Sequence, residues 1–210
     1  MNETTTALAR ENDRPKTLVD LLGAMKGEIA KCLPRHLTPE RMTRVALSAV
    51  RTTKNLAQCD QQSFAACLMS ASAMGLEPNT PAGECYLIPR RSKAGGYECT
   101  LMVGYQGLLR LARNSGELAD IYAVTVREGD HFVQTLGLAR TLEHIPSADP
   151  GRASRPVTHA YAVARLKGST EPTFVVLDRS EIEQRRKRGA SGQGHSSPWD
   201  TDYSTMAEKS

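Results

Sequence analysis

The spacing of apolar residues changes at Pro78, and this change constrains the fold more than any other feature of the sequence. Before it, three segments repeat apolar residues at helical intervals. Each segment is preceded by a residue that caps helix N-termini, namely Thr17, Thr38 and Asp60. The sequence therefore predicts three helices before Pro78, and the last of them should end at Gly75.

Beyond Pro78 the pattern is that of strands joined by turns. Residues 84–91 and 97–103 are short apolar runs on either side of a Gly-rich tip, which predicts a β-hairpin. Residues 104–115 return to helical spacing.

Two more strand pairs are expected, residues 118–128 with 131–136 and residues 157–167 with 172–178. A further helix is predicted from Ser180, capped together with the glutamate three residues later. This order predicts an α+β fold, in which N-terminal helices are followed by β-hairpins and an antiparallel sheet with packed helices.

The expected organisation has four parts, divided by composition. They are a flexible arm over 1–16, a single α+β core over 17–188, a Gly/Ser-rich loop over 189–198 and the start of a C-terminal basic helix over 199–210. No apolar run reaches the roughly 20 residues that cross a bilayer, and residues 1–17 lack the apolar region of a secretory signal. We therefore expect a cytoplasmic protein without a membrane partner.

Positive charge is concentrated late in the chain. Residues 155–188 contain eight Lys and Arg against four Asp and Glu, and so they carry the whole net charge of +4. Such a region permits an anionic partner without demanding one.

The predicted strand 157–167 suggests what that partner is. Its even positions are small or apolar, whereas its odd positions include His159, Tyr161, Arg165 and Lys167. One face would pack and the other would present rings and cations, which bind unpaired bases and phosphates. The alternative is that Arg165 and Lys167 simply solvate the end of a strand.

Other basic groups recur on successive predicted elements. Each basic group alone is explained as solvated surface, but together these groups indicate a positive groove. The groups are Arg90, Arg91 and Lys93 at the hairpin tip, Arg110 with Arg113, and Arg185 with Arg186. Trp199, the single tryptophan, could either stack on a base or cap the core.

Signatures of bond-making chemistry are missing from the sequence. There is no GxxxxGK[ST], GxGxxG or GxSxG motif, and the five cysteines form no CxxC pair, so we expect no metal site. The carboxylates that could serve a metal nuclease are scattered along the predicted strands; they are Glu84, Glu98, Asp120 and Glu128. A metal-dependent nuclease is therefore the weakest alternative.

Several motifs, in order and with similar spacing, resemble the RecT family of phage recombinases. The resemblance spans residues 32–209 and rests on LPRHLTPERM (33–42), MGLEP (74–78), YLIP (86–89), VGYQG (103–107), LAR (111–113), VREGD (126–130), the strand 157–167, and SPW (197–199) with Met206 and Lys209.

This resemblance implies an annealing-protein-like core that binds single-stranded DNA and anneals complementary strands without ATP. It implies a protein of phage or prophage origin with no enzymatic step and no cofactor, and it leaves open whether Mg²⁺ aids DNA binding. The implied partners are single-stranded DNA, the annealed duplex intermediate, further copies of the chain in a ring or helical filament, a phage exonuclease and the host single-strand-binding protein. A non-annealing single-stranded DNA-binding module remains the main alternative.

By the same resemblance, eight residues are expected nearest the DNA: Tyr105, Gln106, Arg110, Arg113, Arg127, Arg165, Lys167 and Lys209. Gln106 stands where relatives often carry Arg, and the sequence ends at Ser210 where the family continues into a longer basic helix. We therefore expect a core that keeps the fold but binds DNA more weakly than a full-length annealing protein.

Overall fold

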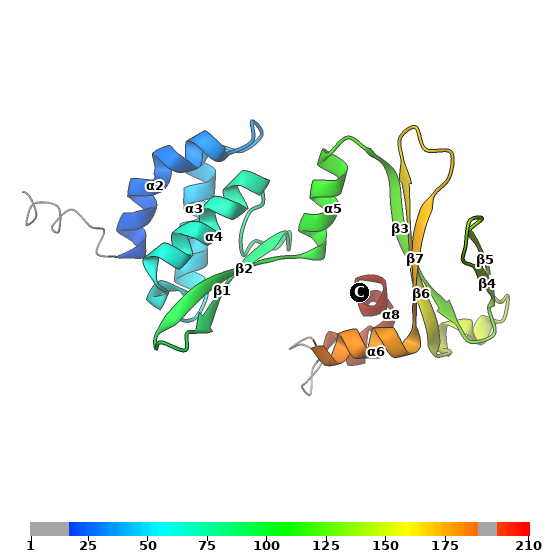
Figure 1. Cartoon of the computed structure of the whole chain (residues 1–210). Coiled ribbons are helices and arrows are strands. Elements are labelled where there is room, and N and C mark those ends of the chain that lie inside the picture. The colour runs from blue at the N-terminus through cyan, green and yellow to red at the C-terminus, as the bar shows by residue number, and fades with distance from the viewer. Residues whose placement is uncertain (1–16, 189–196) are drawn as a thin grey trace, which may run out of the picture. The chain divides into compact units, whose positions relative to one another are not determined.

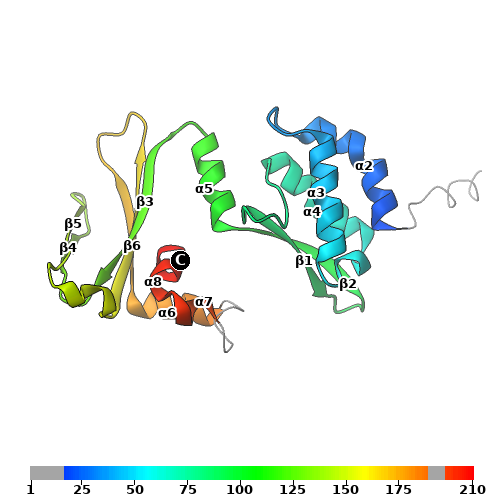
Figure 2. The same ribbon diagram turned by 180° about the vertical axis from the view of Figure 1, so that it is seen from behind.

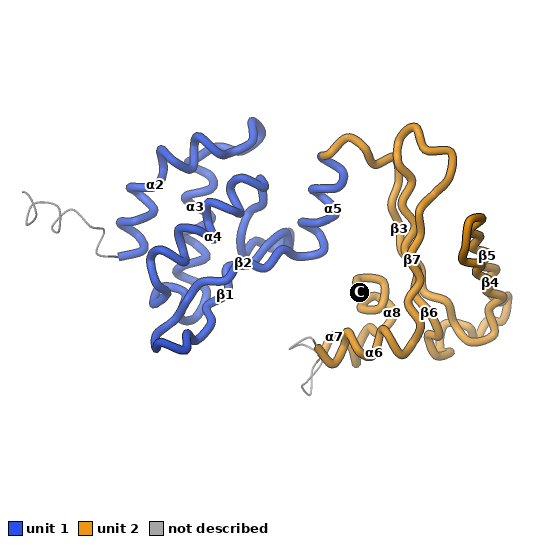
Figure 3. Tube along the Cα trace, viewed as in Figure 1, with its two compact units in different colours: residues 1–114 blue, residues 115–210 orange. Residues whose placement is uncertain are grey.

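The computed structural model describes residues 17–188 and 197–210, and it divides the chain into two compact units, residues 1–114 and 115–210 (Figure 3). Helices and antiparallel sheets in these units confirm the predicted α+β class. The single core expected over 17–188 extends across both units and stays a prediction. The arm expected over 1–16 and most of the loop expected over 189–198 lie outside the described residues.

Unit 1 begins with the three predicted helices, α2 (Leu18–Cys32), α3 (Pro39–Thr52) and α4 (Gln61–Met74), with a short 3₁₀ turn, η1 (Leu56–Gln58), before α4 (Figure 1). The side chains of Thr17, Thr38 and Asp60 each accept a hydrogen bond from a backbone N–H of the first turn. Helix α4 ends at Gly75, whose φ of 67° is easily adopted only by glycine. The predicted helix starts and this end are confirmed.

The predicted hairpin of unit 1 is also present, as β1 (Cys85–Arg91) paired antiparallel with β2 (Tyr97–Val103). Buried side chains of the hairpin, including Leu87 and Cys99, join those of the helices, including Phe64 and Leu68, in one apolar cluster. Helix α5 (Tyr105–Asn114) follows β2 directly.

Unit 2 is built on a three-stranded antiparallel sheet of order β3-β6-β7, formed by β3 (Leu118–Arg127), β6 (Val157–Leu166) and β7 (Thr173–Asp178). The pairing of β6 with β7 was predicted, but the pairing of 118–128 with 131–136 was wrong. Strand β4 (His131–Thr135) instead pairs with β5 (Thr141–Ile145) in a separate hairpin, and β3 pairs with the central strand β6.

The two faces of this sheet are covered by different elements (Figures 1 and 2). Helices α6 (Arg179–Arg188), α7 (Pro198–Thr201) and α8 (Tyr203–Glu208) pack on one face, around Ala160, Leu177 and Ile182. The β4–β5 hairpin covers the other, where Tyr161 and Val163 pack with Phe132 and Leu142. A 3₁₀ turn, η2 (Pro150–Ser154), lies between β5 and β6 in the chain.

The C-terminal segment is more broken than expected. The start of one basic helix was predicted over 199–210, but α7 and α8 are short helices separated at Asp202, whose side chain caps α8. No helix among the described residues is both long and apolar enough to cross a membrane.

Candidate nucleic-acid interface

The end of β6 presents the cations that the sequence predicted there. Arg165 and Lys167 are both exposed, and Arg165 lies opposite Asp120 of β3 in the sheet register. The backbone N–H of Lys167 donates to the carbonyl of Glu117 at 2.8 Å, which fixes the chain while leaving the side chain in solvent. These two side chains are available to phosphate.

The aromatic side chain Tyr161, predicted on the same face of β6, is not available to bind DNA bases. Tyr161 is only 9% exposed, and its hydroxyl lies 3.2 Å from Nδ1 of His144. The ring of Phe132 lies 6.0 Å from that of Tyr161 and 5.1 Å from that of His159, centroid to centroid. The expectation that Tyr161 presents its ring to bases was wrong, because the β4–β5 hairpin covers this face of β6. His159 is half-buried, and its ring packs against Phe132.

Of the two roles considered for Trp199, the structure supports packing in the core. It is 5% exposed, belongs to the apolar cluster under α6, and its ring meets that of Tyr203 edge-on at 5.7 Å. The alternative in which Trp199 stacks on a base is contradicted, because a buried indole offers no free face to a nucleotide.

The basic residues of α6 divide between solvent and the C-terminal helices. Arg186 pairs with Asp200 of α7, and Arg185 donates to the carbonyl of Ser210 at 2.5 Å. Lys209 is exposed just after α8. Arg185 and Arg186 therefore hold α7 and α8 to α6, a role that their charge alone did not predict.

Helix α6 itself starts two residues before the predicted position. Asp178 accepts from the N–H of Glu181, and Glu181 accepts from the N–H of Asp178, so the capping box uses this pair rather than Ser180 with Glu183. Strand β7 runs into the helix with no intervening loop, which moves the cap to the last residue of the strand.

In unit 1 the hairpin tip is basic and open. Arg90, Arg91 and Lys93 are all exposed, and the guanidinium of Arg91 lies 6.0 Å from the ring centroid of Tyr97. Such a contact orients an arginine without neutralising its charge. The tip is thus a second place where phosphate can be bound.

Helix α5 carries four of the predicted DNA-binding residues, in different environments. Tyr105 is 40% exposed, and the side-chain amide of Gln106 donates a hydrogen bond to the Tyr105 hydroxyl at 2.7 Å. Arg113 is exposed. Arg110 is different, because its guanidinium forms an ion pair with the buried carboxylate of Glu84. The sequence did not predict that partner.

Glu84 links α5 to the rest of unit 1. Its second oxygen accepts from the N–H of Glu77 at 3.0 Å, and the Glu77 carboxylate pairs with Arg41 of α3. The hydrogen bond from Arg41 holds the pKa of Glu77 below its usual value. Two largely buried carboxylates thus connect α3, the segment before β1 and α5, and Arg110 is a positioning residue in this chain of contacts.

The start of α5 also has no room for side chains at two glycines of the VGYQG motif. A Cβ on Gly107 would lie 2.2 Å from the carbonyl oxygen of Glu84, and one on Gly104 would lie 2.3 Å from that of Gly83. The helix therefore approaches this backbone so closely that only glycine fits.

Gly107→Ala is expected to destabilise unit 1 by about 1 to 3 kcal/mol, because the added methyl must displace backbone rather than a flexible side chain. Amide hydrogen exchange within α5 measures the effect. Gly27→Ala is the matched control, since a Cβ there meets nothing within 4 Å and alanine favours a helix interior by about 1 kcal/mol. Equal exchange in the two variants would contradict the close packing of α5.

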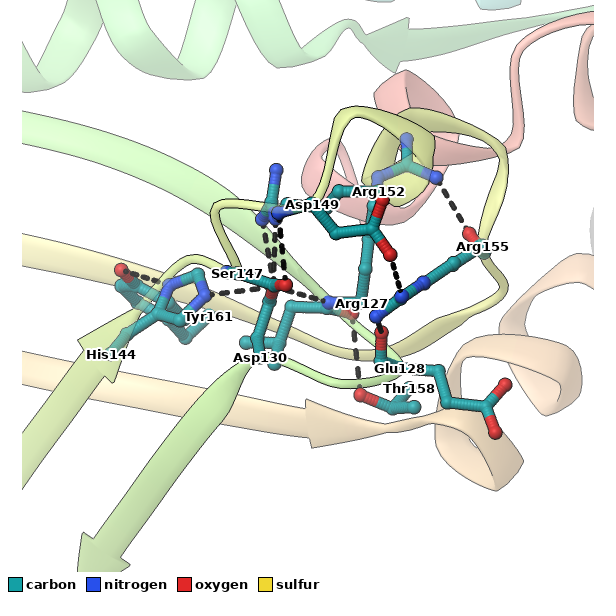
Figure 4. Close-up of polar contacts among 11 residues, drawn as sticks. Arg127, Glu128, Asp130, His144, Ser147, Asp149, Arg152, Arg155, Thr158 and Tyr161 are labelled. Atoms are coloured by element: carbon teal, nitrogen blue, oxygen red, sulfur yellow. Dashed lines mark hydrogen bonds and ion pairs between the residues drawn. The ribbon is translucent and has the colours of Figure 1, made fainter.

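Arg127, the remaining predicted residue, lies in a polar network at the end of β3 (Figure 4). Its N–H donates to Oδ2 of Asp130 at 2.8 Å, and its Nη1 donates to the carbonyl of Arg155 at 2.8 Å. Asp130 is the centre of this network, although sequence reasoning singled it out only as the end of the VREGD motif.

The carboxylate of Asp130 is completely buried and receives five hydrogen bonds (Figure 4). Arg152 donates two of them, each at 2.7 Å, and the N–H of Ser147 and a ring nitrogen of His144 donate two more. The Arg152 guanidinium, with these other donors, holds the pKa of Asp130 far below its usual value. Since a carboxylate only accepts, Nε2 of His144 carries the proton.

This network fastens the hairpin that covers β6. His144 lies on β5 and Arg152 on η2, and both bind an aspartate in the turn after β3. His144 and Arg152 lie 14 and 22 residues from Asp130 along the chain. Sequence motifs do not pair residues that are so far apart.

The described residues contain no group of three or more His, Cys, Asp and Glu side chains arranged to hold a metal ion. Of the carboxylates considered for a nuclease, Glu84 is paired with Arg110 and Glu98 accepts from the hydroxyl of Ser92. The arrangement instead offers exposed cations on several elements and the exposed aromatic rings of Tyr105 and Tyr122, which suits binding of a flexible polyanion.

Comparison with known proteins gives two matches. The model of the RecT family matches residues 40–210. Protein RecT of Escherichia coli (strain K12) is 42% identical over 190 residues, which cover 89% of this chain and 68% of that protein.

Proposed function

This chain belongs to the RecT family, and on that premise we propose that it binds single-stranded DNA and anneals complementary strands without ATP. Membership supports a role in recombination and strand annealing. The observation that carries the finer proposal is the identity of 42% to Protein RecT over most of the chain. The exposed cations of both units are consistent with it.

Annealing requires that the backbone be held while the pairing edges of the bases stay free. Contacts to phosphate meet this requirement, because they carry no sequence information and leave the bases accessible. The exposed side chains proposed for this role are those at the hairpin tip and at the end of β6, Arg90, Arg91, Lys93, Arg165 and Lys167. Tyr105, 40% exposed, is the aromatic residue proposed to stack on a base.

The mechanism has no covalent step. Cations that bind phosphate release counterions, and two strands neutralised on one protein surface no longer repel each other as they pair. We also propose that several copies of the chain act on one strand. An exonuclease partner, the host single-strand-binding protein and a contribution from Mg²⁺ to DNA binding remain expectations.

Mixing two complementary labelled oligonucleotides, without nucleotide or divalent metal, tests the proposal. The chain should accelerate formation of the duplex, and a pair of non-complementary strands should give no signal. Binding of each strand without acceleration of pairing would contradict annealing and favour a single-stranded DNA-binding module. Strands shortened on a denaturing gel when Mg²⁺ is added would favour a nuclease.

A further inference from the structure

We infer that a hollow of about 600 Å³ in unit 2, lined by Arg127, Arg155 and Arg179, binds a phosphate group. The three arginines come from the end of β3, the segment before β6 and the first turn of α6. The inference rests on the proposed function for the source of that phosphate, which is the backbone of a DNA strand. The same chemistry would also accept a free phosphate or nucleotide.

The inference starts from the half-buried cations of the described part of the chain. Five arginines are half-buried there, and four pair with a carboxylate: Arg110 with Glu84, Arg152 with Asp130, Arg155 with Asp149 and Arg186 with Asp200. The fifth, Arg127, has no carboxylate within 4 Å among the described residues; its guanidinium donates to the carbonyl of Arg155.

A cation that is partly withdrawn from water and has no counter-charge is costly, so it favours an anion beside it. A guanidinium has five N–H donors, and the contact with the Arg155 carbonyl uses one of those of Arg127. An anion in the hollow beside Arg127 would therefore be stabilised by this guanidinium.

The second arginine, Arg155, is held in place rather than mobile. It pairs with Asp149 and donates to the carbonyl of Glu128 at 3.3 Å. A Cβ on Gly129, whose φ is 85°, would lie 2.1 Å from its Nη1, so its guanidinium lies directly over the backbone of this turn. The φ of 85° explains why the turn of the VREGD motif carries glycine.

Arg179 supplies an exposed charge on another side of the hollow. No carboxylate lies within 4 Å of it in the ranges that the structure describes. The two aspartates in the lining are already engaged, since Asp200 pairs with Arg186 and Asp202 accepts from the N–H of Thr205 at 3.2 Å. Among the described residues, neither carboxylate lies within 4 Å of the guanidinium of Arg127 or Arg179.

The guanidinium groups supply the donors for an oxyanion. The hydroxyls of Ser154, Thr201 and Ser204 also line the hollow, but each already donates to a protein oxygen. Planar guanidinium groups bind phosphate oxygens through paired N–H donors. The volume exceeds that of one phosphate, so a sugar attached to it can also enter.

The test uses the full chain and two probes. Inorganic phosphate, compared with chloride at equal ionic strength, should raise the melting temperature of the wild type, because a ligand that binds only the folded state stabilises it. A labelled oligothymidylate, titrated over a salt series, should bind with a slope of log affinity against log salt that reflects its phosphate contacts.

Arg179→Gln is the main variant, since Arg179 is exposed and its loss should not disturb folding. It should abolish the response to phosphate, weaken oligothymidylate about tenfold and reduce the salt slope by about 0.7, the effect of one contact to a single strand. Arg127→Gln should do the same, although it also removes the contact with the Arg155 carbonyl. Arg44→Gln, which removes an exposed charge from α3, is the matched control and should change the phosphate response not at all.

Each outcome decides. Loss of both responses in the two variants supports a site for the DNA backbone, and loss of the phosphate response alone supports a site for free phosphate or a nucleotide. Variants that match the wild type with both probes would overturn the inference, even if the wild type binds DNA well. If the wild type binds no oligothymidylate, the proposed function fails, and the phosphate titration still decides whether the hollow is an anion site.

Discussion

Asp130→Asn is expected to lower the free energy of unfolding of unit 2 by about 3 kcal/mol or more. The substitution leaves the guanidinium of Arg152 without its carboxylate partner and gives a ring nitrogen of His144 a weaker acceptor. Both partners are at most a quarter exposed, so water cannot replace the lost contacts fully. Trp199, the single tryptophan, lies in this unit. Its fluorescence emission therefore reports the unfolding of unit 2 in urea.

The same substitution has a defined dependence on pH. The pKa of Asp130 is lowered in the folded protein, so its stabilising contribution is complete above the ordinary carboxyl pKa of about 4 and declines as the pH falls below it. The difference between the wild type and Asp130→Asn that comes from this carboxylate should therefore be at its full size at neutral pH, well above about 4. It should shrink in acid.

Asp149→Asn is the matched control, because it removes a carboxylate that is 45% exposed from an arginine pair in the same segment, whereas the carboxylate of Asp130 is fully buried. Exposed pairs contribute at most about 1 kcal/mol, so this variant should stay close to the wild type. If the two variants were equally stable, Asp130 would not be the residue that fastens the β4–β5 hairpin.

Arg110→Gln should destabilise unit 1 by about 2 to 3 kcal/mol, because it leaves the carboxylate of Glu84 buried without its cation. The structure makes Arg110 a positioning residue for α5, whereas the sequence placed it beside DNA. Amide hydrogen exchange in α5 should therefore rise in this variant. The salt slope of DNA binding should stay unchanged.

Two further variants distinguish these roles. Arg113→Gln removes an exposed charge from the same helix and should leave its exchange unaltered. The double variant Arg110→Gln with Glu84→Gln removes both charges and should recover part of the stability lost by Arg110→Gln alone. A reduced salt slope with normal exchange in Arg110→Gln would instead make Arg110 a direct contact to phosphate.

Local signals account for what the sequence predicted well. Thr17, Thr38 and Asp60 mark helix starts because their capping hydrogen bonds join residues only three apart. The hairpin of β1 and β2 is recognisable because its strands flank a Gly-rich tip.

The errors arise where long-range packing decides. No strand was predicted from the sequence at residues 141–145, which form β5, and without β5 the hairpin over β6 could not be anticipated. Tyr161 was therefore assigned to a solvent-exposed face when Phe132 covers it. The partners of Arg110 and Asp130 lie 26 and up to 22 residues away, beyond the reach of spacing rules.

The rate of annealing across a salt series tests the central claim most directly. Two complementary oligonucleotides are mixed with the wild-type chain, without nucleotide or metal, at increasing concentrations of sodium chloride. If phosphate contacts hold the strands, the acceleration is large at low salt and falls linearly on logarithmic axes as salt rises. No acceleration at the lowest salt, although the chain is folded, would contradict the account.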